Sequence, residues 1–343
     1  MHTQKKKERT RKKMELKNEE SYEIVANTLI KCLDKLLPYL KQSDIYEVYC
    51  NPDGSLYTLS NRKGKERLDF NLTPAEAMLI IKNVAALDGR IIDDDRPMLD
   101  AKIPANPEFS MCRFNGLMPP IVDQPSFNIR KHATTIYTLD DYLKQGTFTQ
   151  EQYDITMDCI HRRRNIIVAG GTGSGKTTLI NAILAEISKS PDRVVSIEDT
   201  NELQYSGADY VPLVASGKVT MADCVINSLR MTPKRIVVGE VRGPEAMSLF
   251  TAWSTGHKGG CCTVHSNSAA DTMLRLVDMT SQVAKNSQPR LIANAIDVIL
   301  YLQNYNNRRW VEDIISIDGY DDEKHEFVHH KLDVHSKPPK LDN

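Results

Sequence analysis

The sequence has little of several features that mark particular classes of protein. Its seven cysteines are scattered and odd in number, and none belongs to a CxxC pair. This pattern argues against a zinc ribbon and against a disulfide framework, and it favours a reducing, cytosolic setting. Aromatic residues make up only 6% of the chain and the formal net charge is −1. Neither value predicts a groove that binds nucleic acid directly.

Long apolar segments are also scarce. The longest apolar stretch, residues 291–302, contains Asn294 and Asp297 and is too short to span a bilayer. We recognise no secretory leader, so we expect a soluble protein. Residues 5–13 nevertheless carry seven basic side chains opposed only by Glu8. Such a run is typical of a solvated tail, and it would also suit an anionic membrane surface or, less readily, nucleic acid.

The chain is longer than one ordinary core, so we expect two domains. Residues 1–20 are interpreted as a basic tail and residues 21–145 as a smaller mixed α+β domain. In residues 146–315, apolar strand-like runs alternate with helical segments, which is typical of an α/β domain with a mainly parallel sheet. Residues 316–343 are polar and end in a proline-containing segment, which predicts a loosely held tail.

Local signals fix several elements. Pro52, Asp53 and Gly54 predict the turn of a hairpin. Thr73 and Glu76 predict a capping box at the start of a helix that ends near Gly89. Two further capped helices are expected over 138–146 and 149–164, leading into the second domain. The proline-rich residues 96–131 suit short strands and turns.

The most informative stretch is "GGTGSGKTT", residues 170–178, between an apolar run and a helical segment. Glycines allow the backbone to approach phosphate closely at a helix N-terminus, the lysine reaches the β- and γ-phosphates, and the threonine hydroxyl binds Mg²⁺. A simple glycine-rich turn is the alternative. We predict that these residues bind ATP or GTP: Gly170, Gly171, Thr172, Gly173, Ser174, Gly175, Lys176, Thr177 and Thr178.

Carboxylates end two of the apolar runs. Glu240 follows "RIVVG", where it would polarise water or hold Mg²⁺ near the phosphates, although a surface glutamate is the alternative. Glu198, Asp199 and Glu202 follow "VVSI". Crowded carboxylates favour a cation among them, and helix capping by Asp199 or Thr200 is the alternative. The predicted Mg²⁺ ligands are Thr177, Glu198 and Glu240.

The segment "HKGGCCTVH" contains His257, Cys261, Cys262 and His265. A zinc site is disfavoured, because adjacent cysteines in a strand point to opposite faces of the sheet. His265 would instead hydrogen-bond the γ-phosphate and sense its cleavage. A buried structural histidine is the alternative for both histidines, more so for His257.

Four blocks in this order resemble the Walker A, Asp-box, Walker B and His-box motifs of the type II/type IV secretion ATPases. They are "GGTGSGKTTLINAIL", "SIEDTNELQ", "SLRMTPKRIVVGEVRGPEA" and "STGHKGGCCTVHSNS". The segments "IRKHATTIYTLDDYLKQG" and "TGHKGGCCTVHSN" most resemble the TrbB branch, the conjugative-transfer relatives of the VirB-type traffic ATPases. The similarity is strong over residues 125–305 and only general over residues 21–124.

This resemblance implies a homohexameric ring whose subunits hold a RecA-like domain and hydrolyse ATP with Mg²⁺. It implies a place on the cytoplasmic face of the bacterial inner membrane, beside the inner-membrane components of a secretion or conjugation apparatus. Arg113 and Arg130 match positions where the family brings arginines to phosphate; surface ion pairs are the alternative. Three more arginines match family positions without a clear role, with structural ion pairing at subunit contacts as the alternative, and Lys234 stands where the family usually has an acid. These arginines are Arg230, Arg235 and Arg242.

The sequence also fits other functions. A pilus or type II secretion motor would share the core, although type II motors commonly carry a paired-CxxC insert. A RecA-type helicase would need a basic or aromatic groove. A ring scaffold that binds ATP without hydrolysing it is the third alternative, and Glu240 argues against it.

Overall fold

The computed structural model describes residues 22–60, 62–131, 136–216, 218–284, 288–305 and 308–333. The chain divides into two compact units, Met1–Thr134 and Thr135–Asn343. The boundary therefore falls earlier than the predicted division at residues 145 and 146. The predicted basic tail, residues 1–20, lies outside the described residues.

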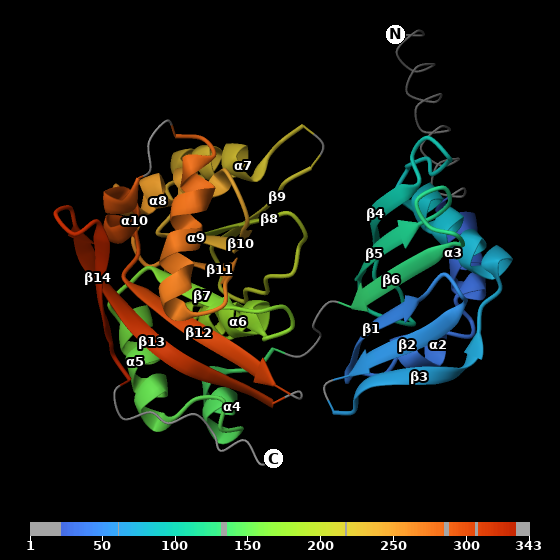
Figure 1. Ribbon diagram of the computed structural model, residues 1–343, viewed down its shortest axis with the longest axis horizontal. Helices are drawn as coiled ribbons and strands as arrows, with labels where there is room; N and C mark the ends of the chain where they lie inside the picture. The colour runs from blue at the N-terminus through green and yellow to red at the C-terminus, as the bar shows by residue number, and fades with distance from the viewer. Residues whose placement is uncertain are drawn as a thin grey trace, which may run out of the picture. The chain divides into compact units, whose positions relative to one another are not determined.

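The first unit contains a six-stranded antiparallel sheet in the order β3-β2-β1-β6-β5-β4. Helices cover one face, where alternate strand residues pack into a single apolar core (Figure 1). Its elements are β1 (Ile45–Cys50), β2 (Ser55–Ser60), β3 (Gly64–Asn71), β4 (Met98–Ile103), β5 (Cys112–Leu117), β6 (Ser126–Lys131), α2 (Leu37–Leu40) and α3 (Pro74–Leu87).

Local signals in this unit act as predicted. Gly54 in the β1–β2 turn has φ +79°, and a Cβ there would lie 2.2 Å from the carbonyl oxygen of Leu72, so only glycine fits the turn. The capping box at α3 forms as expected, because Thr73 and Glu76 each bond the other's backbone N–H. The proline-rich residues 96–131 form the short strands β4, β5 and β6.

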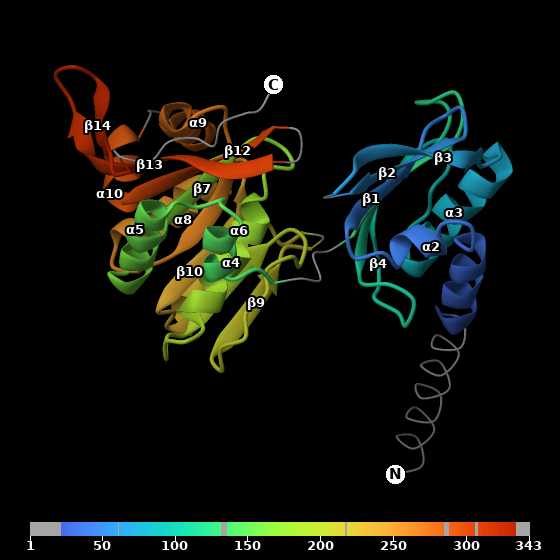
Figure 2. The same ribbon diagram turned by 90° about the horizontal axis from the view of Figure 1, so that it is seen from below.

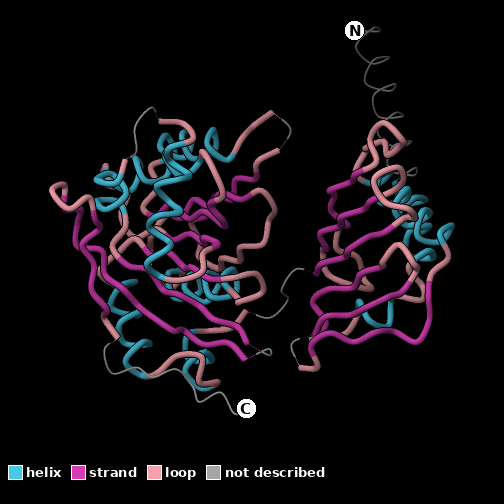
Figure 3. The backbone as a smooth tube through the Cα atoms, viewed as in Figure 1, coloured by secondary structure: helices cyan, strands magenta, loops and turns pink. Residues whose placement is uncertain are grey.

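The second unit contains an eight-stranded sheet in the order β14-β13-β12-β7-β11-β10-β8-β9 (Figure 3). Pairings among β12, β7, β11, β10, β8 and β9 are parallel, and the β12–β13 and β13–β14 pairings are antiparallel. The strands are β7 (Ile166–Gly170), β8 (Val194–Glu198), β9 (Tyr210–Val214), β10 (Arg235–Val241), β11 (Cys261–His265), β12 (Val298–Tyr305), β13 (Arg308–Asp321) and β14 (Glu326–Lys331).

Helices cover both faces of this sheet (Figure 2). Ile166 and Val168 of β7 point to the core beneath α4, α5 and α6, whereas Ile167 and Ala169 point to the core beneath α7 to α10. Such apolar side chains on both faces are typical of parallel strands. The helices are α4 (Leu139–Lys144), α5 (Gln150–His161), α6 (Lys176–Ile187), α7 (Met221–Ser228), α8 (Glu245–Ser254), α9 (Ala269–Ser281) and α10 (Pro289–Ala295).

The prediction of a loosely held tail after residue 316 is wrong for residues 316–333. These residues complete β13 and form β14. Asp333 is fully buried; it accepts hydrogen bonds from the backbone N–H of Ile314 (3.0 Å) and from Gln152 Nε2 (2.7 Å). The polar composition concealed this hairpin because most of β14 faces solvent. The helices α4 and α5, predicted to lead into the second domain, both lie within it.

Among the described residues, no helix combines the length and the apolar character needed to cross a bilayer. All seven cysteines are free thiols, and six of them are buried.

Candidate active site

The glycine-rich loop joins β7 to α6, as predicted from its spacing. Gly173 and Gly175 have φ values of +72° and +96°, and Gly175 is the N-cap of α6. A Cβ at Gly170 would lie 2.4 Å from the carbonyl oxygen of Leu302 on β12. The loop conformation therefore depends on glycine at three positions and leaves the first turn of α6 open to an anion.

Lys176 is the first residue of α6, and its side chain curls back over the loop. Its Nζ donates hydrogen bonds to the carbonyl oxygens of Gly170 (3.0 Å) and Gly171 (2.8 Å). Only 7% of the residue is exposed. Thr177 and Thr178 follow in the first helical turn and are half-buried. The buried Ser174 hydroxyl has no hydrogen-bond partner among the described residues, so the loop retains polar capacity that its own fold does not use.

His265 links this loop to the end of β10. Its Nδ1 lies 3.3 Å from Lys176 Nζ, and its Nε2 lies 3.0 Å from Glu240 Oε1. A lysine ammonium can only donate, so Nδ1 accepts and the ring proton sits on Nε2. Nε2 lies within ion-pair distance of Glu240 Oε1, but that oxygen has no hydrogen-bond partner among the described residues. Burial and the neighbouring Lys176 charge lower the His265 pKa. Both effects favour the neutral ring.

Glu240 is held from its other side by Arg242. The guanidinium places Nη2 2.5 Å from Glu240 Oε2 and Nη1 3.0 Å from Asp199 Oδ2. The alternative of an isolated surface glutamate does not fit these contacts, since only 18% of the Glu240 side chain is exposed. A continuous polar chain thus runs through Lys176, His265, Glu240, Arg242 and Asp199.

A bulge in β10 aims Glu240. The pairing of β10 with β11 shifts register between Val238 and Val241, and bulges of this kind redirect side chains beside active sites. The hydroxyl of Thr263 on β11 donates to the carbonyl oxygen of Gly239 within the bulge (2.7 Å). A Cβ at Gly239 would lie 3.1 Å from Glu198 Cγ, so glycine lets Glu198 pack against the bulge.

Glu198 ends β8 and is almost completely buried, at 3% exposure. Its Oε1 accepts hydrogen bonds from the backbone N–H groups of Glu202 (2.8 Å) and Leu203 (2.9 Å). Its Oε2 has no hydrogen-bond partner among the described residues. Burial raises the Glu198 pKa to about 7. No helix begins in residues 199–209, so neither Asp199 nor Thr200 caps one there. Glu198 instead holds the loop that follows β8, and one of its carboxylate oxygens stays available.

The Cys–Cys pair behaves as strand alternation predicts. Cys261 packs into the core beneath α4 to α6, and Cys262 packs into the core on the other face of the sheet. Burial raises the pKa of both thiols, that of Cys261 to about 12. His257 lies half-buried, with Nδ1 3.3 Å from the carbonyl oxygen of Ala252. The two sulfur atoms therefore cannot face one ion.

The predicted arginines lie in four different places. Arg113 on β5 and Arg130 on β6 are register partners in the first unit, on the sheet face opposite its core. Arg242 belongs to the polar chain with Glu240, and Arg230 is exposed in the short helical turn η1 (Leu229–Met231). The exposed Lys234 donates its backbone N–H to the carbonyl oxygen of Arg193.

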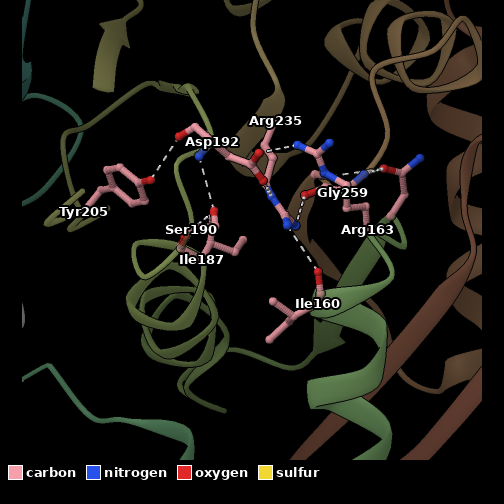
Figure 4. Close-up of polar contacts among 10 residues, drawn as sticks. Ile160, Arg163, Ile187, Ser190, Asp192, Tyr205, Arg235 and Gly259 are labelled. Atoms are coloured by element: carbon pink, nitrogen blue, oxygen red, sulfur yellow. Dashed lines mark hydrogen bonds and ion pairs between the residues drawn. The ribbon is translucent and has the colours of Figure 1, made fainter. Parts of the chain in front are cut away.

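Arg235 lies at the opposite end of β10 from Glu240. It is 4% exposed, and its Nε donates to Asp192 Oδ2 (2.7 Å), as Figure 4 shows. Its terminal nitrogens donate to the carbonyl oxygens of Gly259 (3.1 Å) and Ile160 (3.2 Å). Arg163 binds the other oxygen of Asp192. Arg235 is therefore a structural ion-pair partner, as the alternative held, and its partner Asp192 belongs to the same chain.

Two site residues were missed by the sequence reasoning. Asn304 Nδ2 (3.0 Å) and Arg309 Nε (3.2 Å) both donate to the carbonyl oxygen of Gly173 in the glycine-rich loop. They come from β12 and β13, more than 120 residues after the loop. No local pattern marks them, because their proximity arises only from the pairing of β12 with β7.

Comparison with known proteins identifies the family to which this chain belongs. The sequence model of the family described as "Type II/IV secretion system protein" matches residues 29–308. The chain therefore belongs to the type II/IV secretion system protein family. Within it, the conjugal transfer protein TrbB of Rhizobium radiobacter is 37% identical over 305 residues, covering 87% of this chain and 91% of that protein. The TrbB-like resemblance predicted from the motif blocks is confirmed.

Other known proteins and solved structures are also similar to this chain. A probable TrbB of Sinorhizobium fredii is 36% identical over 307 residues, covering 87% of this chain and 91% of that protein. The ATPase DotB of Legionella pneumophila matches with a TM-score of 0.61 at 21% identity, over 85% of this chain and 81% of DotB. The pilus retraction motor PilT, solved with bound ADP, matches with a TM-score of 0.59 at 20% identity, over 78% and 77%. The last two likenesses concern the fold alone.

Proposed function

We propose that this chain is an ATPase with a RecA-like second domain that powers assembly or substrate transfer by a bacterial type IV secretion (conjugation) system. The observation that carries the proposal is the polar chain from Lys176 through His265 to Glu240. It joins a phosphate-binding loop to a carboxylate held at the edge of the same sheet. The relatives named TrbB support the conjugation context.

The residues fit a nucleotide with its cation. The glycine-rich loop has no Cβ atoms at its tightest points, the Ser174 hydroxyl is buried without a partner among the described residues, and so is Glu198 Oε2. Oxygen donors of this kind suit Mg²⁺. We assign Thr177, Glu198 and Glu240 to the metal, directly or through water. When bound, Mg²⁺ would neutralise charge on the phosphates.

The protein's own groups then have distinct roles in this proposal. Lys176 exchanges its contacts with the loop carbonyls for phosphate oxygens and neutralises their charge. Glu240 accepts a proton from the attacking water, and Arg242 fixes its carboxylate. His265 loses its contact with Lys176 when the lysine turns to phosphate, so its ring is placed to respond to the γ-phosphate. The predicted phosphate contacts of Arg113 and Arg130 remain part of the proposal.

We further propose a homohexamer attached peripherally to the inner membrane from the cytoplasm, in contact with inner-membrane components of the apparatus. A type IV pilus or type II secretion motor is the second candidate function, because the family includes type II as well as type IV secretion system proteins. A non-catalytic ATP-binding ring is the remaining alternative.

One experiment separates a catalytic ring from a non-catalytic one. The purified chain is weighed by light scattering with and without Mg²⁺-ATP, and its phosphate release is measured beside that of Lys176→Ala. We expect a ring, slow turnover in the parent and none in the variant. A ring without turnover would support the scaffold, and turnover equal in both proteins would exclude this site.

Arg130→Ala should weaken the preference for ATP over ADP, and an unchanged preference would remove Arg130 from the proposal.

A further inference from the structure

The β12–β13 hairpin extends beyond the strand that carries the glycine-rich loop. Leu302 on β12 is the register partner of Gly170, the last residue of β7, and β12 continues to Tyr305. The last residues of β12 and the first of β13 therefore lie past the end of β7, beside the loop. Asn304 and Arg309 face each other across this hairpin.

Both side chains meet the same atom of the loop. Asn304 Nδ2 donates to the carbonyl oxygen of Gly173 at 3.0 Å, and Arg309 Nε donates to it at 3.2 Å. Gly173 has φ +72°, a conformation that few other residues adopt. A Cβ at Gly175 would lie 3.4 Å from Arg309 Cδ, so the arginine stem also packs along the loop.

The Asn304 amide carries an energetic cost in the folded protein. Its Oδ1 is buried and has no hydrogen-bond partner among the described residues, and an unpaired buried acceptor is unfavourable. An apolar side chain would avoid that cost. The amide is therefore explained by what its Nδ2 does, which is to hold the Gly173 carbonyl.

From these contacts we infer that Asn304 and Arg309 are positioning residues that hold the glycine-rich loop in its phosphate-binding conformation before nucleotide arrives. Preorganisation lowers the cost of ordering the loop on binding. It also makes the β12–β13 hairpin a physical route by which a change at the hairpin end would alter nucleotide affinity. The inference rests on the proposed function only in naming nucleotide as the ligand.

The test compares Asn304→Ala and Arg309→Ala with two matched neighbours. Gln303→Ala removes an amide that bonds Glu312 within the hairpin (2.9 Å) rather than the loop, and Arg308→Ala removes the adjacent arginine. Three quantities are measured for each protein: amide hydrogen exchange of residues 171–176 without nucleotide, the Kd of ADP by fluorescence titration, and the melting temperature without nucleotide.

We expect both clamp variants to exchange these amides faster and to bind ADP roughly tenfold more weakly, the loss typical of one hydrogen bond. The melting temperature should stay near the parental value, as in both controls. Arg309→Lys, which keeps a donor, should recover most of the affinity. Because the two side chains share one acceptor, the double variant should lose less than the product of the single effects.

Several outcomes would overturn the inference. Unchanged exchange in Asn304→Ala would show that the loop holds itself. Weaker ADP binding in Arg309→Ala alone would assign the effect to charge at the phosphates. Equal effects in the controls, or a matching fall in melting temperature, would reduce both residues to ordinary packing. If the parent binds no nucleotide, the proposed function fails, while the exchange comparison still decides whether the clamp exists.

Discussion

The second sheet carries a charged cluster at each end of the same parallel strands, and the two clusters differ in how completely they are paired. At the amino ends, Asp192 is shared by Arg235 and Arg163, and Arg235 also binds two backbone carbonyls. At the carboxyl ends, Ser174 Oγ and Glu198 Oε2 are buried with no partner among the described residues.

This difference separates a structural network from a site. A buried charge whose partners are all present holds the fold together, and removing one partner leaves the other charge uncompensated. Buried polar atoms without partners lower stability and are retained where a ligand completes them. Ligands of open α/β sheets bind at the carboxyl ends of the strands, which is where Ser174 Oγ and Glu198 Oε2 lie.

The largest effect is expected when one charge is removed from the fully paired cluster at the amino ends of the strands. Asp192→Asn should lower the free energy of unfolding by about 3–5 kcal/mol, because Arg235 is left buried without a counter-charge. Turnover at a temperature where the variant is folded should stay near the parental value. Urea unfolding and phosphate release measure the two effects. A large loss of turnover in the folded variant would show that the two ends of the sheet are coupled.

Glu240→Gln, at the carboxyl ends of the strands, should instead lower turnover while leaving the free energy of unfolding nearly unchanged. Loss of the proton acceptor should lower turnover by about a hundredfold to a thousandfold, equivalent to roughly 3–4 kcal/mol. The amide keeps the shape of the side chain, so urea unfolding and ADP affinity should change little. A variant that releases phosphate at the parental rate would exclude the role proposed for Glu240.

The two ends also differ in how far they could be predicted. The strand-loop-helix around Lys176 and the ends of β8, β10 and β11 follow from local spacing, because glycine, charge and apolar runs are visible in short windows. The Arg235 cluster and the Gly173 contacts could not be predicted, since strand order alone brings their members together. The hairpin beyond residue 316 was missed because an edge strand needs only one buried face.

A third prediction uses the titration of Glu198. The native state raises its pKa from the ordinary 4.5 to about 7, so the folded protein keeps a proton that the unfolded chain releases. Stability should therefore fall by about 3 kcal/mol as pH rises from 4.5 to 7, and then level off. Glu198→Gln keeps an acceptor for the Glu202 and Leu203 N–H groups and should flatten this decline.

Urea unfolding at several pH values checks this prediction. If Glu198 holds Mg²⁺ as proposed, adding Mg²⁺ at pH 8 should stabilise the parent more than Glu198→Gln. An equal pH slope in both proteins would show that Glu198 is not the group that titrates.

The smallest effect is expected at His265. Its ring contacts both Lys176 and Glu240, but it carries out neither the phosphate binding assigned to Lys176 nor the proton transfer assigned to Glu240. His265→Ala should lower turnover by about tenfold to a hundredfold, at the low end of the range for a positioned proton-transfer or hydrogen-bonding group. ADP affinity should change less than threefold, because Lys176 and the loop remain. His265→Gln, which keeps a donor and an acceptor, should recover part of the rate; if both variants bind ADP as weakly as they turn over ATP, the histidine serves only to hold Lys176 in the loop.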